Sequence, residues 1–199
     1  MNILETIPKS DSDLLLESWG YNLITEYHQM LKAAKFNNSI ILDLATGTGR
    51  ASSVLTRMNF NVLTGDYSLD KKSEAERRIT EKYFNKVKFV KLNLESLPFD
   101  DDSIENIVCL NTLHELSNPV KCLEEIIRVH SRTGIMLLAD FNPLGFDVMD
   151  RLHLSRFNKV HPRGNILPET TLKILQENYF KINLLSTELN SGFIVLGKN

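Results

Sequence analysis

The sequence predicts an α/β fold in which helices cover both faces of a mostly parallel sheet. Short runs rich in valine, isoleucine and leucine alternate with longer segments whose apolar residues recur at helical spacing. A glycine-containing turn, Asp43–Arg50, joins the first apolar run to the next helical segment. Near the end of the chain, two strand-like runs flank a short polar turn, and such a hairpin predicts that one strand is antiparallel to the rest.

The elements follow one another in a regular order. Residues 12–36 predict one or two helices before the sheet, with Asp11 or Ser12 as the cap. The apolar runs predict five buried strands: Ile40–Leu44, Asn61–Gly65, Val87–Leu92, Asn106–Asn111 and Gly134–Asp140. The segments between them predict three helices: Ala51–Met58, Leu69–Phe84 and Asn118–His130, with Pro119 in the first turn of the last. The tail predicts a hairpin of Phe180–Thr187 and Phe193–Gly197.

Composition narrows the class of protein. A chain of 199 residues, 42% apolar and 24% charged, is typical of one globular domain rather than a disordered chain. A net charge of -2 without a basic patch gives no general basis for binding nucleic acid. We expect no membrane span, because no apolar run approaches the roughly 18 residues required.

Cys109 and Cys122 lack zinc-site spacing and indicate a cytoplasmic protein with reduced thiols. Asp100–Asp102 is interpreted as a solvated turn, so we expect no metal site.

The turn Asp43–Arg50 has the features of a ligand-binding loop. Glycines at a strand-to-helix turn let a ligand approach the main chain, and the following helix offers unpaired amide donors. A carboxylate at Asp43 is unfavourable beside a pyrophosphate but suits the ammonium group of an amino acid. Ser52 stands where the dinucleotide fingerprint requires a third glycine or alanine. The loop therefore favours an amino-acid-bearing ligand over NAD, with an ordinary tight turn as the alternative.

Two further residues end predicted strands. Asp66 ends the second strand at the distance from Gly49 that one helix and one strand require, where a carboxylate can accept ribose hydroxyls. Its alternative role is to cap the next helix. Asn93 ends the third strand with an amide that can donate and accept, which fits an adenine edge.

With these elements in order, the chain resembles the class I S-adenosylmethionine-dependent methyltransferases, in the branch of small UbiE-like (type 11) enzymes. The resemblance runs from about Ile40 to the C-terminus. Besides the residues above, it rests on these segments: Leu97–Phe99 with acidic residues after it, Ile107–Asn111 leading into Leu113–Leu116, and Pro119–Val129. It implies a Rossmann-like three-layer sandwich with seven strands in the order 3-2-1-4-5-7-6, the seventh antiparallel.

The resemblance also implies the cofactor, S-adenosylmethionine, and the residues that hold it. Asp43 and the backbone of Ala45, Gly47 and Gly49 would meet its methionine part. The remaining contacts would be Asp66 to the ribose hydroxyls, Tyr67 against the adenine, Asn93 and Leu94 at the adenine edge, and Asn111, Thr112 and His114 at the opening toward the acceptor. Ala45 and Asn93 depart from the family, which often has glycine and aspartate there.

The acceptor side is predicted after the fourth and fifth strands, where open α/β sheets bind ligands. His114 is a candidate general base, or a residue that shapes the cofactor pocket. Asp140 either orients His114 or caps a loop, and we treat the two as the candidate catalytic residues. We expect one domain over residues 1–199, with a helical extension over 1–37 and an insertion over 142–168. That insertion, with His153, His161 and Arg163, is placed to roof the acceptor pocket.

The predicted function is methyl transfer to a small molecule, by in-line displacement, in a monomer or homodimer. The alternatives are a protein that binds the cofactor without turnover and an NAD-dependent reductase. Nucleic-acid methylation is disfavoured, because Asn111–His114 stands where amino methylases carry Asn/Asp-Pro-Pro-Tyr/Phe.

Overall fold

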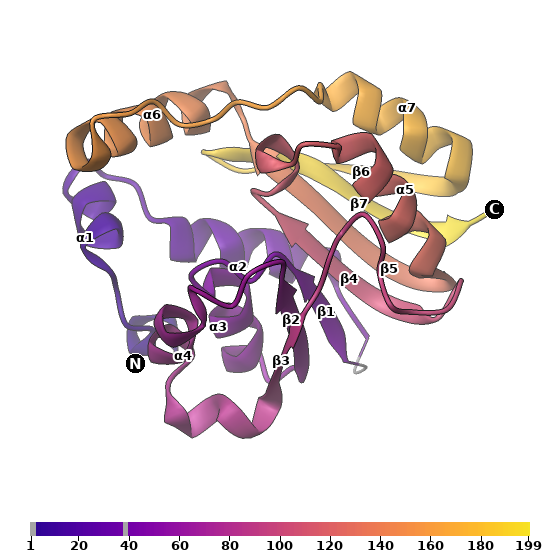
Figure 1. Cartoon of the computed structure of the whole chain (residues 1–199), viewed down its shortest axis with the longest axis horizontal. Helices are drawn as coiled ribbons and strands as arrows, with labels where there is room; N and C mark the ends of the chain where they lie inside the picture. Colours follow the sequence, from indigo (N-terminus) through magenta and orange to yellow (C-terminus); the bar gives the residue numbers. More distant parts are fainter. Residues whose placement is uncertain (1–2, 38–39) are drawn as a thin grey trace.

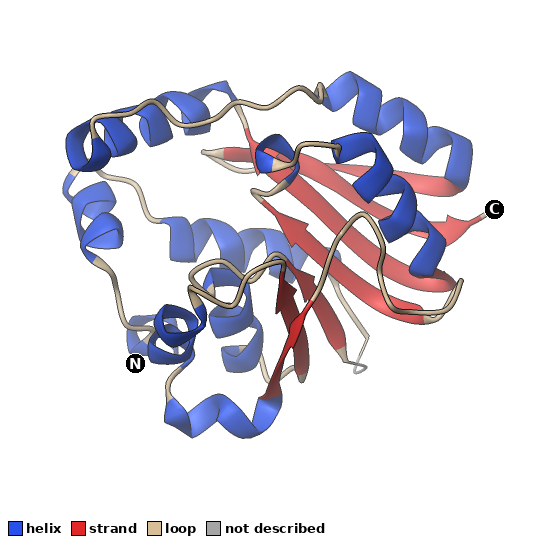
Figure 2. Cartoon of the chain, viewed as in Figure 1, coloured by secondary structure: helices blue, strands red, loops and turns tan. Residues whose placement is uncertain are grey.

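A seven-stranded sheet lies at the centre of the molecule, with helices on both of its faces (Figures 1 and 2). The computed structural model describes residues 3–37 and 40–199. The strands are β1 (Ile41–Leu44), β2 (Val62–Asp66), β3 (Val87–Lys91), β4 (Ile104–Leu110), β5 (His130–Phe141), β6 (Tyr179–Ser186) and β7 (Asn190–Lys198). Their order is β3-β2-β1-β4-β5-β7-β6, and β7 is antiparallel to both of its neighbours. The predicted fold class and strand order are therefore confirmed.

The helices alternate with the strands along the chain. They are α1 (Asp11–Ser18), α2 (Leu23–Ala34), α3 (Arg50–Arg57), α4 (Lys72–Ile79), α5 (Pro119–Val129), α6 (Pro143–Phe157) and α7 (Pro168–Asn178). Three short 3-10 helices accompany them: η1 (Ile3–Thr6), η2 (Glu81–Lys86) and η3 (Leu113–Glu115). None of the helices in the described ranges is long and apolar enough to cross a membrane.

The two faces of the sheet carry two separate cores, because successive side chains of a strand point in opposite directions. In β1, Leu42 and Leu44 belong to the core under α5 and α7, which also contains Leu123 and Leu175. Ile41 belongs to the core on the opposite face, which α2 and α3 cover. Strands buried on both faces explain why the sequence shows continuous apolar runs instead of alternation.

Three predicted helix boundaries are wrong, each for a local reason. The cap of α1 is Ser10, not Asp11 or Ser12, because its side chain accepts from the Asp13 amide while the Asp13 carboxylate accepts from the Ser10 amide. The helix predicted over 69–84 divides into α4 and η2 at Thr80, whose φ of 70° ends the helix. His130 starts β5 instead of ending α5.

A third apolar cluster joins the N-terminal helices to α6. Leu16 of α1, Phe141 at the end of β5 and Leu152 of α6 are buried together. In Figure 1, α6 lies beside α1 at one end of the molecule, and a long loop, whose Gly164 lies against His114 of η3, leads from α6 to α7. The packing of α6 against α1 places α6 and the 158–167 loop above the carboxyl ends of the central strands.

Residues 1 and 2 of the expected 1–37 extension lie outside the described residues.

Candidate functional site

The glycine loop follows β1 and holds Asp43 at its base. Asp43 is buried, and its carboxylate accepts hydrogen bonds from the hydroxyls of Ser52 and Thr64, the latter at 3.0 Å. Ser52, the residue that breaks the dinucleotide fingerprint, thus has a role in this site: it anchors the acid. Ala45 and Gly47 adopt left-handed backbone angles, with φ of 60° and 49°, which a tight loop of this kind requires.

Burial governs the ionisation of Asp43. Desolvation raises the pKa of its carboxyl to about 6, although the hydrogen bonds from Ser52 and Thr64 act to lower the pKa. Because the pKa is higher in the folded protein than in the unfolded chain, the folded state retains a proton that the unfolded chain has lost. The Asp43 contribution to stability is therefore present below pH 3.8 and disappears as the pH rises to about 6.

We expect Asp43→Asn to remove this pH dependence. Asparagine does not titrate, so the stability of the parent relative to the variant should fall by about 2–3 kcal/mol between pH 4 and pH 7. Urea unfolding at a series of pH values measures both proteins. Parallel stability curves for the two proteins would contradict the assigned pKa.

Asp66 lies at the end of β2, directly beside the glycine loop. Its Oδ2 accepts a hydrogen bond from the Gly47 amide at 2.9 Å. The structure thus brings the second predicted acid to the loop, although the two residues are 19 positions apart. Gly49 ends the loop with φ of 78°, and a Cβ there would lie 2.9 Å from Ala75 of α4. Glycine at this position therefore lets α4 pack against the start of α3.

A cavity of about 480 Å³ opens beyond β3. Tyr67, Asn93 and Leu94 line it, together with Glu115 from η3. Tyr67 is 68% exposed, with the Lys91 ammonium 5.8 Å from its ring, and Asn93 accepts from the Glu95 amide in the turn after β3. The three residues predicted for the adenine are thus together at one cavity.

Asn111 and Thr112 follow β4 where the chain turns. Asn111 has φ of 52°, and its side-chain amide donates to the Tyr27 hydroxyl at 3.3 Å. Its Oδ1 is buried and has no hydrogen-bond partner among the described residues. A buried acceptor without a donor is costly unless a ligand supplies one. Thr112 is buried and donates to the Leu110 carbonyl, so its hydroxyl is already engaged.

The structure brings His114 and Asp140 together. This contact is what the first alternative for Asp140, that it orients His114, requires. Nδ1 of His114 lies 2.5 Å from Oδ1 of Asp140, and the His114 amide donates to Oδ2 at 3.1 Å. Nε2 of His114 lies 2.9 Å from Nε2 of His161, so both ring nitrogens of His114 are engaged. The imidazole is buried, whereas the Asp140 side chain is 25% exposed.

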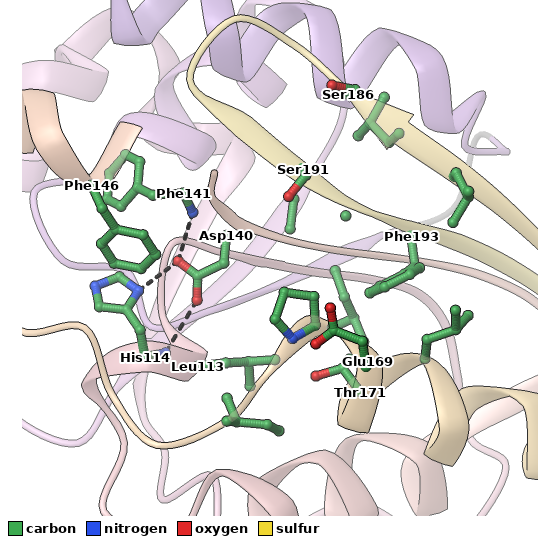
Figure 3. Close-up of a pocket in the computed structure, with 18 of the residues that line it drawn as sticks. Leu113, His114, Asp140, Phe141, Phe146, Glu169, Thr171, Ser186, Ser191 and Phe193 are labelled. Carbon is green, nitrogen blue, oxygen red and sulfur yellow. Dashed lines mark hydrogen bonds and ion pairs between the residues drawn. The ribbon is translucent and has the colours of Figure 1, made fainter. Parts of the chain in front are cut away.

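Figure 3 shows the pocket of about 460 Å³ that these residues adjoin. Asp140 lines the pocket with its carboxylate turned toward His114, while Glu169 and Thr171 of α7 lie on the opposite side of the pocket. Its walls come from β5, β6, β7, α7 and the 158–167 loop. Of the three insertion residues singled out in the sequence, only Arg163 is among the lining residues. His161 contacts the His114 ring, and His153 contacts His161. Sequence reasoning missed Glu169 and Thr171, because nothing in their local pattern distinguishes them from other residues of an amphipathic helix.

Comparison with known proteins identifies the family of this chain. The profile of a family described as a methyltransferase domain matches residues 35–179. A demethylmenaquinone methyltransferase of Clavibacter sepedonicus is 33% identical over 102 residues, which are 51% of this chain and 41% of that protein. The ubiquinone/menaquinone biosynthesis C-methyltransferase UbiE of Blochmanniella pennsylvanica is 26% identical over 160 residues, covering 76% of this chain and 62% of that protein. The chain thus covers less than two thirds of the length of these relatives.

A solved structure has the same fold. The SAM-dependent methyltransferase from Aquifex aeolicus superimposes with a TM-score of 0.64 at 20% identity, covering 94% of this chain and 99% of that one. At this identity the likeness concerns the fold alone. The family profile, which matches well over half of the chain, decides the assignment. The chain belongs to the class I S-adenosylmethionine-dependent methyltransferase family.

Proposed function

We propose that the protein transfers a methyl group from S-adenosylmethionine to a small-molecule acceptor. The observation that carries the proposal is the contact between the Asp66 carboxylate and the Gly47 amide, next to the buried Asp43. Asp43 at the base of the loop is unfavourable beside a pyrophosphate but suits an ammonium group, and Asp66 suits ribose hydroxyls. The absent third glycine at Ser52 likewise disfavours the reductase alternative.

The cofactor contacts in this proposal are those that the family resemblance implies. Asp43, Ala45, Gly47 and Gly49 face the methionine part, and Asp66 faces the ribose. Tyr67, Asn93 and Leu94 take the adenine in the 480 Å³ cavity, an assignment that their shared position supports. The unpartnered Oδ1 of Asn111 supports a cofactor contact beside Thr112, since the ammonium or a hydroxyl of the cofactor would supply the missing donor.

S-adenosylmethionine supplies a methyl group on a sulfonium, already activated for in-line displacement. The residues of this chain therefore need chiefly to align the acceptor and to exclude water. We place the acceptor in the 460 Å³ pocket, which residues of the 142–168 insertion, among them Phe146 and Arg163, help to line. Its largely apolar wall favours a molecule with an apolar body and few polar groups.

For the acceptor chemistry we propose a division of roles between the two candidate catalytic residues. In this proposal the partly exposed carboxylate of Asp140, which lines the pocket, contacts the acceptor and can orient a hydroxyl or accept its proton. His114 holds Asp140 through its Nδ1, at 2.5 Å, and acts on the acceptor through that carboxylate. The two unpaired, buried cysteines support a reducing, cytoplasmic setting for the reaction.

Calorimetric titration with S-adenosylhomocysteine and with NADH tests the cofactor assignment. We expect the parent protein to bind the homocysteine product and not NADH. Asp66→Ala should weaken product binding by about 1.5–3 kcal/mol, because a charged acceptor of hydrogen bonds is lost. Asp70→Ala, at an exposed position in the turn that follows β2, is the control and should leave the affinity unchanged. Binding of NADH alone, or equal affinities of the Asp66 variant and the parent, would refute the assignment.

A further inference from the structure

Two buried histidines from distant parts of the chain face each other beside the acceptor pocket. His114 lies in η3 after β4, and His161 lies in the loop between α6 and α7. Their Nε2 atoms are 2.9 Å apart, and the two residues are 4% and 5% exposed. The proposed function uses His114 through its Nδ1 but gives no role to His161 or to the contact between the two rings, so that contact requires its own explanation.

The other nitrogen of each ring also has a partner. Nδ1 of His114 lies 2.5 Å from the Asp140 carboxylate, and Nδ1 of His161 lies 3.4 Å from Nδ1 of His153. The carboxylate partner places the proton of neutral His114 on Nδ1, so its Nε2 presents a lone pair to His161. With the proton of His161 on Nε2, the two rings share a hydrogen bond. With that proton on Nδ1, facing His153, two lone pairs meet at 2.9 Å and repel unless a cation lies between or beside them. A histidine that binds a metal through one ring nitrogen commonly donates the N–H of its other ring nitrogen to a carboxylate, as His114 can to Asp140.

Glu115 provides a third donor at the same place. Its Oε1 lies 3.8 Å from Nε2 of His114, and one donor atom from each of His114, Glu115 and His161 lies within 4.8 Å of the others. Ligand bonds of about 2.0–2.2 Å to a tetrahedral zinc ion place neighbouring donors about 3.3 Å apart, between the two distances found here. To complete such a set, the two histidine nitrogens at 2.9 Å separate slightly and the exposed Glu115 side chain moves closer.

We propose that His114, His161 and Glu115 bind one divalent transition-metal ion, with Zn²⁺ as the reference ion. Two histidines and one glutamate match the donor set of open zinc sites, which keep a position for a further ligand. Glu115 also lines the 480 Å³ cavity and His114 the 460 Å³ pocket, so the ion lies between them. A small molecule with an oxygen, nitrogen or sulfur donor would take the remaining position. The site departs from the expectation of no metal, and it does not depend on methyl transfer.

Binding of Zn²⁺ to the chelator-treated full chain, in competition with a chromophoric chelator and without S-adenosylmethionine, tests the proposal. We expect one ion per chain, and a tetrahedral visible spectrum when Co²⁺ replaces Zn²⁺. Asp140→Asn should weaken binding by roughly 10–100-fold, as loss of an outer partner does. His161→Gln and Glu115→Gln should each weaken it as well, and His161→Gln more than Asp140→Asn.

Two controls keep the result interpretable. His28→Gln changes a histidine of α2 outside this cluster and should leave ion binding unchanged. Asp66→Ala should lose cofactor affinity and keep the ion, which separates this inference from the proposed function. Circular dichroism and urea unfolding establish that each variant is folded. If the parent shows no saturable uptake of one ion, or if His161→Gln binds as well as the parent, a shared proton joins the two imidazoles and the metal site is refuted.

Discussion

Replacing Asp13 by asparagine is expected to destabilise the protein by about 3–5 kcal/mol, because it leaves buried arginine charge without its partner. Asp13 of α1 lies 2.9 Å from Arg50 of α3 and 2.7 Å from Arg78 of α4. Burial alone would raise the pKa of Asp13, but the two guanidinium groups and the hydrogen bonds from Ser10 together outweigh it and hold that pKa well below its ordinary value. Arg78 is 3% exposed and also donates to the Thr48 carbonyl in the glycine loop.

Asp11→Asn provides the matched control for this experiment. Asp11 shares the first turn of α1, so both variants lose one favourable charge near the helix N-terminus. Its own partner, Arg156, is 3.4 Å away, and the Asp11 side chain is 85% exposed. Urea unfolding at pH 7 should show a much smaller change for Asp11→Asn than for Asp13→Asn. Equal changes would mean that the buried triad does not hold α1 against the glycine loop.

Replacing Gly164 by alanine should disrupt the contact between the 158–167 loop and η3. Gly164 has φ of 68°, and a Cβ there would lie 2.4 Å from the His114 carbonyl oxygen. Left-handed strain of about 1–2 kcal/mol and overpacking of about 1–3 kcal/mol together predict a loss of about 2–5 kcal/mol. The backbone must move to relieve the clash, so the 2.9 Å contact between His114 and His161 should lengthen or break.

Gly197→Ala isolates the steric part of this effect. Gly197 has the same φ of 68°, but a Cβ there would meet only the Phe180 side chain at 3.7 Å, an ordinary contact. Both variants therefore carry the left-handed strain, and only Gly164→Ala carries the clash. Denaturant unfolding, with NMR spectra of the histidine rings, measures both consequences. If the two variants lose the same stability and keep the same ring signals, close packing at Gly164 does not position His161.

Patterns local in sequence predicted the elements and much of the proposed cofactor region. The apolar runs located all seven strands, since the central strands are buried on both faces and β6 and β7 form a hairpin; the edge strand β3 is only half-buried. Asp43, Gly47 and Asp66 were singled out by type and spacing, and the loop brings them to one place. Boundaries such as Ser10 and Thr80 were missed, because they depend on side-chain capping and backbone angles that periodicity does not encode.

The sequence by itself determined the α/β architecture and the acid-flanked glycine loop, because both follow from hydrophobic periodicity and residue type within short segments. Only the tertiary structure decided which residues meet across the molecule. Asp13 meets Arg78 across 65 positions, and His114 meets His161 across 47. Contacts of that range depend on how α1 and the loop after α6 close over the carboxyl ends of the strands. A short sequence pattern cannot predict such contacts. Bringing distant residues together costs chain entropy, and only the packing of the whole fold offsets that cost.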